Sequence, residues 1–313
     1  MHVSLSRARE HHRGRLLTGA ALTLAGTLLA AGLFTSGLNA AQRADADAII
    51  TGSIEPQKTD IPFELRIEVT KPGNEGMELS ARLSEDGGLI TRPVHWKVRR
   101  ATTDGGLAAG SAPELLEAEE PVSNLFLEPG TYTIEATYGS VSIARDVEVL
   151  KGHYMVYTFV FNVGGLRTLS TLASEPLPTP FRAVHKVYAT SGEASGQLIA
   201  TSDVPGGLMR LGAGNYRLES VIEPGNTVTR TDVSIKPGIL TTLQLDHQAG
   251  IATVNTDAGT AWTITDRNSS WSASGTGPQQ LTLAPGTYDW AGGQKTRMVI
   301  IEAGKHTEVQ GTD

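Results

Sequence analysis

A short motif that occurs three times constrains the fold of this 313-residue chain more than any other feature. The motif reads L-x-x-G-x-Y and covers residues 127–132, 211–216 and 283–288. Each copy is followed by a glycine-containing turn and then by a segment that ends in h-x-h-x-x-G, where h is an apolar residue. These segments end at Gly152, Gly238 and Gly304. A fixed internal order that recurs along a chain indicates repeated structural units.

Apolar and polar residues alternate on both sides of each motif. In the first copy, Tyr132, Ile134 and Ala136 are separated by Thr133 and Glu135. Short runs with a period of two, bounded by Gly, Pro, Asp and Asn, are typical of half-buried antiparallel strands. Strands that recur at intervals of about eight to twelve residues favour a β-sandwich.

One segment of the body has a different pattern. Residues 111–120 begin with Ser111, a good helix N-cap, and an early proline follows it. We therefore expect a helix of one or two turns there. The four glutamates of this segment would form a solvated helix face, or alternatively a docking patch for a basic partner; they are Glu114, Glu117, Glu119 and Glu120.

The repeated tyrosine has a physical interpretation. In immunoglobulin-like sandwiches, a tyrosine near the start of one strand donates its hydroxyl to the backbone a few residues upstream. We expect Tyr132, Tyr216 and Tyr288 to do the same, and the residue two positions after each to face the opposite sheet. Those residues are Ile134, Leu218 and Trp290.

Two further tryptophans precede the first and third motifs, in Trp96-Lys-Val98 and Trp262-Thr-Ile264, and His185-Lys-Val187 precedes the second. We expect Trp96 and Trp262 to face the core from the partner sheet. The alternative is a surface on which sugar rings stack, for which Trp271 is also a candidate. The chain has no cysteine, so each unit depends on its apolar core.

The sequence thus predicts an all-β protein: three tandem immunoglobulin-like β-sandwich units after one N-terminal hydrophobic helix. The expected domains are an export signal or membrane anchor at 1–41, a linker at 42–60, and β-sandwiches at 61–152, 153–238 and 239–313.

The N-terminal segment has the pattern of an export signal. Arginines 7, 9, 13 and 15 precede an uncharged, mostly apolar run that extends from Leu16 to Phe34. A cleaved signal peptide and a retained membrane anchor both fit this pattern, with Ala44-Asp45-Ala46 as a candidate cleavage site. We expect the body in the periplasm, either soluble after cleavage or tethered to the inner membrane by the N-terminal helix.

The charge balance narrows the class of partner. The whole chain carries a net charge of −7, and residues 1–41 hold four arginines against one glutamate, which leaves −10 for the remainder. An acidic surface disfavours nucleic acid and anionic lipid headgroups. We expect membrane contact only through the N-terminal helix.

The L-x-x-G-x-Y units followed by h-x-h-x-x-G resemble the carboxypeptidase-regulatory-like and PEGA-like β-sandwich repeats, as in uncharacterised exported multi-sandwich proteins of alphaproteobacteria. The resemblance covers residues 62–310. The nearest forms of the PEGA tetrapeptide are Glu-Pro-Gly-Thr at 128–131 and Ala-Pro-Gly-Thr at 284–287. The resemblance implies an envelope or surface interaction module without catalysis.

The sequence contains no zinc-binding His-Glu-x-x-His, nucleophile elbow, Walker loop or EF-hand loop. Its histidines are scattered, and a metal needs three or four converging ligands. We therefore assign no catalytic, cofactor-binding or metal residue and expect no cofactor. The leading interpretation is a non-enzymatic, envelope-exported interaction or scaffold protein with a protein partner. The alternative is a carbohydrate- or peptidoglycan-binding envelope protein.

Overall fold

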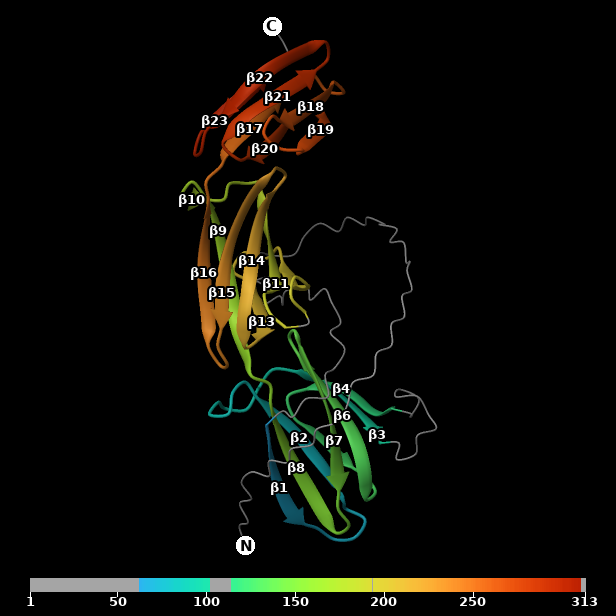
Figure 1. Ribbon diagram of the computed structural model, residues 1–313. Coiled ribbons are helices and arrows are strands. Elements are labelled where there is room, and N and C mark those ends of the chain that lie inside the picture. Colours follow the sequence, from blue (N-terminus) through green and yellow to red (C-terminus); the bar gives the residue numbers. More distant parts are fainter. Residues whose placement is uncertain (1–61, 102–113, 193, 311–313) are drawn as a thin grey trace, which may run out of the picture. The chain divides into compact units, whose positions relative to one another are not determined.

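The computed structural model describes residues 62–101, 114–192 and 194–310. All regular elements of these residues are β-strands, so the expected all-β class is confirmed for this part of the chain (Figure 1). The predicted N-terminal helix at 1–41 and the linker at 42–60 lie outside the described residues. Within the described residues, no helix is long and apolar enough to cross a membrane.

The strands form sheets that share hydrophobic cores in pairs. In the first sheet pair, buried residues of both sheets belong to one core. One sheet has the order β1 (Phe63–Val69), β8 (His153–Val160), β2 (Gly76–Arg82), β5 (Ser123–Phe126). The other has the order β4 (Glu114–Glu120), β3 (Val94–Arg100), β6 (Gly130–Tyr138), β7 (Val141–Val149).

The second sheet pair encloses its own core. One sheet contains β10 (Glu175–Pro176), β9 (Val163–Leu172) and β13 (Leu208–Gly212), with β16 (Leu240–His247) also paired to β9. The other has the order β12 (Leu198–Ser202), β11 (Arg182–Ala189), β14 (Gly214–Glu223), β15 (Thr227–Ile235).

The third sheet pair is formed by the C-terminal strands around another core. One sheet has the order β20 (Gln279–Leu283), β17 (Gly250–Asn255), β23 (His306–Gln310). The other has the order β19 (Ser272–Thr276), β18 (Ala261–Asp266), β21 (Gly286–Gly292), β22 (Lys295–Ile301).

The three sheet pairs share one unusual connection. In each, a late strand runs parallel to an early one: β8 beside β2, β16 beside β9, and β23 beside β17. The expected domain boundaries at 152/153 and 238/239 fall just before β8 and β16. Strand pairing groups β8 with the strands that precede it, and β16 likewise.

The repeated tyrosines behave as predicted. The hydroxyl of Tyr132 donates to the carbonyl oxygen of Glu128 at 2.7 Å. The equivalent bonds from Tyr216 to Gly212 and from Tyr288 to Ala284 are both 2.8 Å long. Each bond spans four residues and ties the start of the motif strand to the loop before it. The residues two positions later are buried, as expected: Ile134, Leu218 and Trp290.

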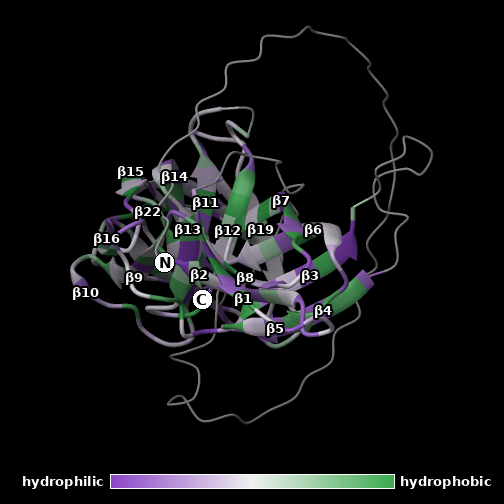
Figure 2. Ribbon diagram, turned by 90° about the horizontal axis from the view of Figure 1, so that it is seen from below, coloured by the Kyte–Doolittle hydropathy of each residue, from purple (hydrophilic) through white to green (hydrophobic). Residues whose placement is uncertain are grey.

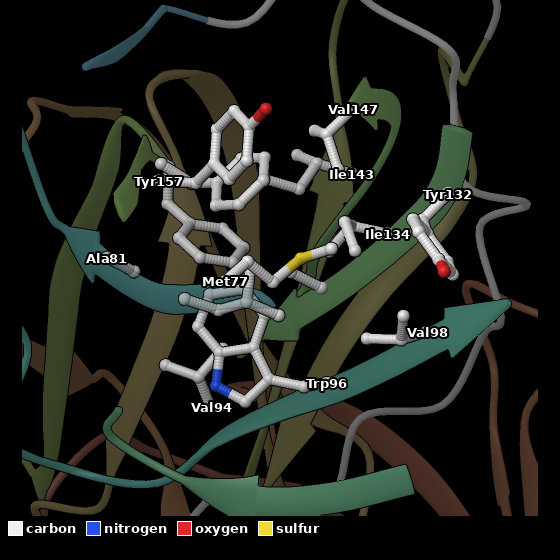
Figure 3. Close-up of a cluster of buried hydrophobic side chains, with 14 of the residues drawn as sticks. Met77, Ala81, Val94, Trp96, Val98, Tyr132, Ile134, Ile143, Val147 and Tyr157 are labelled. Atoms are coloured by element: carbon white, nitrogen blue, oxygen red, sulfur yellow. The ribbon is translucent and has the colours of Figure 1, made fainter. Parts of the chain in front are cut away.

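Trp96 shows how the first core is built. Its indole is fully buried, lies 5.8 Å from the ring of Phe159, and donates its N–H to the carbonyl of Glu120. Figure 3 shows its side chain with those of Met77 and Ile134 between the two sheets. The core positions of Trp96 and Trp262 are confirmed, but the expected sheet is wrong for both. Trp96 pairs with Ala136 on β6 and Trp262 with Gly292 on β21, so each shares the sheet of its motif strand.

The expected helix at 111–120 is also wrong. The described part of that segment is strand β4, which pairs along β3. Leu116 and Ala118 are more buried than Glu117 and Glu119, which alternate with them, so a period of two prevails over the capping signal. Hydrophobic and hydrophilic residues likewise follow one another along β3 and β6 (Figure 2).

Candidate interaction faces

One sheet of each pair contains the motif strand: β6, β14 or β21. Because alternate residues of these strands are buried, the residues between them project from the opposite side of the sheet. We call these sides the first, second and third outer faces, in chain order. They are the surfaces that the three repeats present at equivalent positions, and they differ in charge.

The first outer face is covered by ion pairs. Lys97 on β3 lies 3.0 Å from Glu117 on β4, and Arg99 pairs with Glu135 on β6. The hydrogen bond from Lys97 lowers the pKa of Glu117 and raises that of Lys97. β3 lies inside its sheet, between β4 and β6, so both neighbouring strands supply partners for its basic side chains. Glu114, Glu117 and Glu119 of β4 therefore have partners on β3.

The second outer face carries a similar array. Arg217 on β14 donates two hydrogen bonds to Asp232 on β15, at 2.9 and 3.2 Å, and this pairing lowers the pKa of the carboxyl group. Arg230 on β15 reaches Glu219 on β14 at 2.8 Å. Cross-strand pairs of opposite charge hold these side chains against the sheet.

The third outer face lacks this array. The residue three positions after the motif tyrosine is Glu135 in the first repeat, Glu219 in the second and Ala291 in the third. Ala291 pairs with Thr296, whereas Glu219 pairs with Arg230. Most other residues of this face are small and hydroxylated: Thr263, Thr265, Ser272, Ser274, Thr276 and Thr287.

Two apolar side chains complete the third outer face. Met298 and Ile300 on the edge strand β22 are each 57% exposed. The ion pair within this face joins Asp289 to Arg267 at 2.6 Å, and Arg267 also contacts the sulfur of Met298. Burying hydroxyls, alanine and methionine against a partner costs less than stripping water from charged pairs. Of the three faces, the third is the most readily covered by another surface.

A different surface of the first sheet pair carries an exposed phenylalanine beside a partly buried tyrosine. Phe126 at the end of β5 is 75% exposed, and its ring centroid lies 6.2 Å from that of Tyr154 on β8. Gly76 on β2 lies between them in the same row of the sheet. The two rings are tilted by 53° to each other, so they do not form a flat platform.

The tryptophans considered as a sugar-stacking surface do not form one. Trp96 and Trp262 are buried, as the core interpretation predicts. Trp271 is partly buried and meets the ring of Tyr288 edge-on at 6.3 Å.

The histidines of the described residues fall into two groups. His95 lies beside Glu117 and Glu119 on the first outer face, and His153 and His306 are at least partly exposed. His185 and His247 are instead fully buried, with hydroxyl partners in the second sheet pair. No cluster of three or more potential metal-ligating His, Cys, Asp or Glu side chains occurs in the described part of the chain.

The buried histidine pair was missed, although the sequence held a signal for it. His185 occupies the position at which the other two repeats have Trp96 and Trp262. An imidazole in place of a core indole requires polar partners. His247 has no such signal, because its contacts come from strands far away in the sequence.

No family model matches the chain, and no curated protein matches it. Solved structures that resemble parts of it include the TIE protein of Bacillus anthracis (16% identity, TM-score 0.24), over 82% of this chain and 58% of that one. The chain thus spans under two thirds of that protein. A minor pilin of Streptococcus agalactiae is 15% identical, with a TM-score of 0.29, and the match covers 55% of this chain and 94% of the pilin. A streptococcal ancillary pilin is 13% identical, with a TM-score of 0.33, and the match covers 79% of this chain and 99% of the pilin.

Proposed function

We propose that the chain is a non-enzymatic, exported interaction protein, built from three tandem immunoglobulin-like sandwich units, whose third outer face binds a protein partner. Each unit would consist of one sheet pair, and strand pairing favours β8, β16 and β23 as the strands that close the units. Residues 1–41 would direct export to the periplasm as a cleaved signal or as an inner-membrane tether.

The observation that carries the proposal is the difference between equivalent faces. Two outer faces neutralise their own charges through cross-strand ion pairs, whereas the third presents small side chains and the exposed Met298 and Ile300. Protein interfaces are depleted of charge at their centres and enriched in methionine. A neutral surface also accepts a partner without like-charge repulsion from the acidic body.

The chemistry of the described residues is consistent with a non-enzymatic role. The closest approach to a nucleophile–base pair is Ser220 with His247, whose Oγ and Nε2 atoms lie 2.9 Å apart. Both residues are fully buried between two sheets, so a substrate could not reach the serine oxygen.

The test compares two variants in cells whose envelope proteins are cross-linked. Ile300→Lys places a charge on the third outer face, and Val228→Lys does the same at an exposed apolar residue of β15 on the second. We expect the first variant to lose a discrete cross-linked complex that the second retains. Equal retention in both would contradict the assignment of the face.

A second candidate function is glycan binding at Phe126 and Tyr154. Exposed aromatic rings with nearby hydrogen-bonding groups can stack on sugar rings, and Asn124 accepts a hydrogen bond from the Tyr154 hydroxyl at 3.2 Å. Sedimentation with purified peptidoglycan tests this candidate. Pelleting that Phe126→Ala abolishes and Ile300→Lys leaves intact would replace the proposed function by glycan binding.

A further inference from the structure

The second sheet pair has a row of polar side chains across the inner face of one sheet, where the other pairs have tryptophan. The row runs through Ser202, His185, Ser220 and Thr229 on β12, β11, β14 and β15. The equivalent row of the first sheet pair is Ala118, Trp96, Ala136 and Ile143. In the third, Trp262 lies between Gly275 and Gly292.

The facing sheet completes a hydrogen-bonded cluster. Ser170 on β9 lies 3.1 Å from Nε2 of His185, and the Nε2 atom of His247 on β16 lies 2.9 Å from the Ser220 hydroxyl. Thr229 meets the other ring nitrogen of His247 at 3.1 Å. The two imidazoles share the Ser170 hydroxyl, which also lies 3.4 Å from Nε2 of His247 and 3.1 Å from the Ser220 hydroxyl. These bonds join the two sheets through the centre of the pair.

We propose that this cluster makes the second sheet pair an acid-operated element, in which protonation of His185 or His247 separates the two sheets. The cluster has hydroxyl groups as its partners and no carboxylate to neutralise a new charge. A protonated imidazole also loses its acceptor nitrogen, so a hydroxyl that donates to it must turn away. An isolated charge in such surroundings favours the open, hydrated state.

The charged residues of the surrounding strands point elsewhere. Asp246, next to His247 on β16, accepts hydrogen bonds from Thr171, Ser174 and Gln248 outside the core. On β11, β14 and β15 the charged side chains alternate with the buried ones and belong to the second outer face; they are Arg182, Lys186, Arg217, Glu219, Glu223, Arg230 and Asp232. Arg167 on β9 and Arg210 on β13 alternate with buried residues in the same way.

The direction of the effect follows from burial. Desolvation lowers the pKa of both His185 and His247 from 6.5 to about 4. At His247 the charge of His185 lowers the pKa further, and the negative charge of Asp246 opposes this lowering. Because the folded pKa is depressed, the open state binds protons first, and stability is lost as the pH falls from about 6.5 towards 4. At pH 5 each histidine would favour opening about 30-fold, and the two together up to about 1000-fold.

Protonation of the cluster would affect the part of the chain that lies between the first and third sheet pairs in sequence. Residues 163–247 lie between the first and third sheet pairs in sequence. Separation of the two sheets would therefore open the folded segment that links those pairs along the chain. Acidification would thereby change how the proposed interaction protein joins its two ends, without altering either outer face.

Hydrogen exchange of the full-length protein, measured by mass spectrometry at pH 7.5 and 5.0 and corrected for intrinsic rates, tests the proposal. Protection of β9, β14 and β16 should fall 100- to 1000-fold more than protection of β2, β6 and β8. The double variant His185→Gln/His247→Gln should remove this difference, and His153→Gln/His306→Gln should preserve it.

The wild-type protein alone decides the outcome if the double variant does not fold. Equal changes of protection in the first and second sheet pairs between the two pH values would overturn the proposal. A preferential loss in the second pair that His153→Gln/His306→Gln abolishes would overturn it too, because the trigger would then lie outside the cluster.

Discussion

At the scale of single residues, each motif tyrosine makes the same hydrogen bond from its hydroxyl to a backbone carbonyl four residues earlier. Two of the three, Tyr132 and Tyr288, are almost fully buried, and burial raises the pKa of Tyr288. Tyr288 differs from the others because its hydroxyl also accepts a hydrogen bond from Asn226 at 2.9 Å. The same position therefore has an additional partner in the third repeat.

Replacing each motif tyrosine by phenylalanine should destabilise the segment around it. Tyr132→Phe and Tyr216→Phe each remove one hydrogen bond, and we expect a loss of about 0.5–1.5 kcal/mol. Tyr288→Phe should cost more, because it also leaves the Asn226 amide without its acceptor. Urea unfolding followed by segment-resolved hydrogen exchange measures these losses, with Tyr188→Phe on the outer side of β11 as the control. Unchanged midpoints for all three would show that the bonds contribute nothing.

A second residue-scale prediction concerns packing beside a tryptophan. A Cβ atom at Gly292 would lie 2.3 Å from the ring of Trp290, which is fully buried. Gly292→Ala should therefore cost about 1–3 kcal/mol of stability, the usual penalty for overpacking a core. Gly88→Ala is the matched control, because nothing lies within 4 Å of the added methyl group. A thermal midpoint for Gly292→Ala equal to that of the control would contradict the packing account.

At the scale of elements, the sequence predicted local features better than strand partners. Alternation and the tyrosine motif were sufficient to predict the motif strands, the buried residues that follow each tyrosine and the corner bonds, since these depend on neighbouring residues. The sheet of Trp96 and the partners of β8 depend on contacts between distant strands, which a local pattern does not encode. The helix expected at 111–120 failed for a related reason, because pairing with β3 outweighs a capping signal.

The third outer face and the buried histidine cluster were likewise only partly predictable from the sequence. The change from Glu135 and Glu219 to Ala291 is visible once the repeats are aligned, and so is His185 in place of tryptophan. The consequences of these two changes follow only from the strand register, which places Arg230 opposite Glu219 and Ser220 opposite His185. His247 joins Ser170 and Ser220 from distant parts of the chain, so the cluster could not be read from the sequence.

Element-scale electrostatics should be weak and sensitive to salt. The side chains of Arg217 and Asp232 are more than half exposed, so their pair should contribute at most about 1 kcal/mol. Arg217→Ala should lower the free energy of unfolding by less than this amount at low ionic strength, and by less still in 1 M salt. A double-mutant cycle with Asp232→Ala measures the coupling. A coupling that survives high salt unchanged would contradict the surface ion-pair account.

At the scale of the whole molecule, we propose that residues 1–41 direct the export of the repeated β-sandwich units. If residues 1–41 direct export, a reporter enzyme that is active only outside the cytoplasm should be active when fused after Asp313. Activity of a reporter that works only in the cytoplasm would contradict export. The N-terminus of the native protein, read by mass spectrometry, distinguishes cleavage near Ala46 from a retained anchor.

The central claim is that the three repeats present equivalent faces and that the third one binds a protein. Site-specific photo-cross-linking tests it most directly, with a photoreactive phenylalanine derivative introduced separately at Glu135, Glu219 and Ala291, the same position of the three motifs. The account predicts one discrete adduct from position 291 in cells, lost when Ile300→Lys is added, and none from positions 135 and 219. An adduct from 135 or 219 but not from 291 would contradict it.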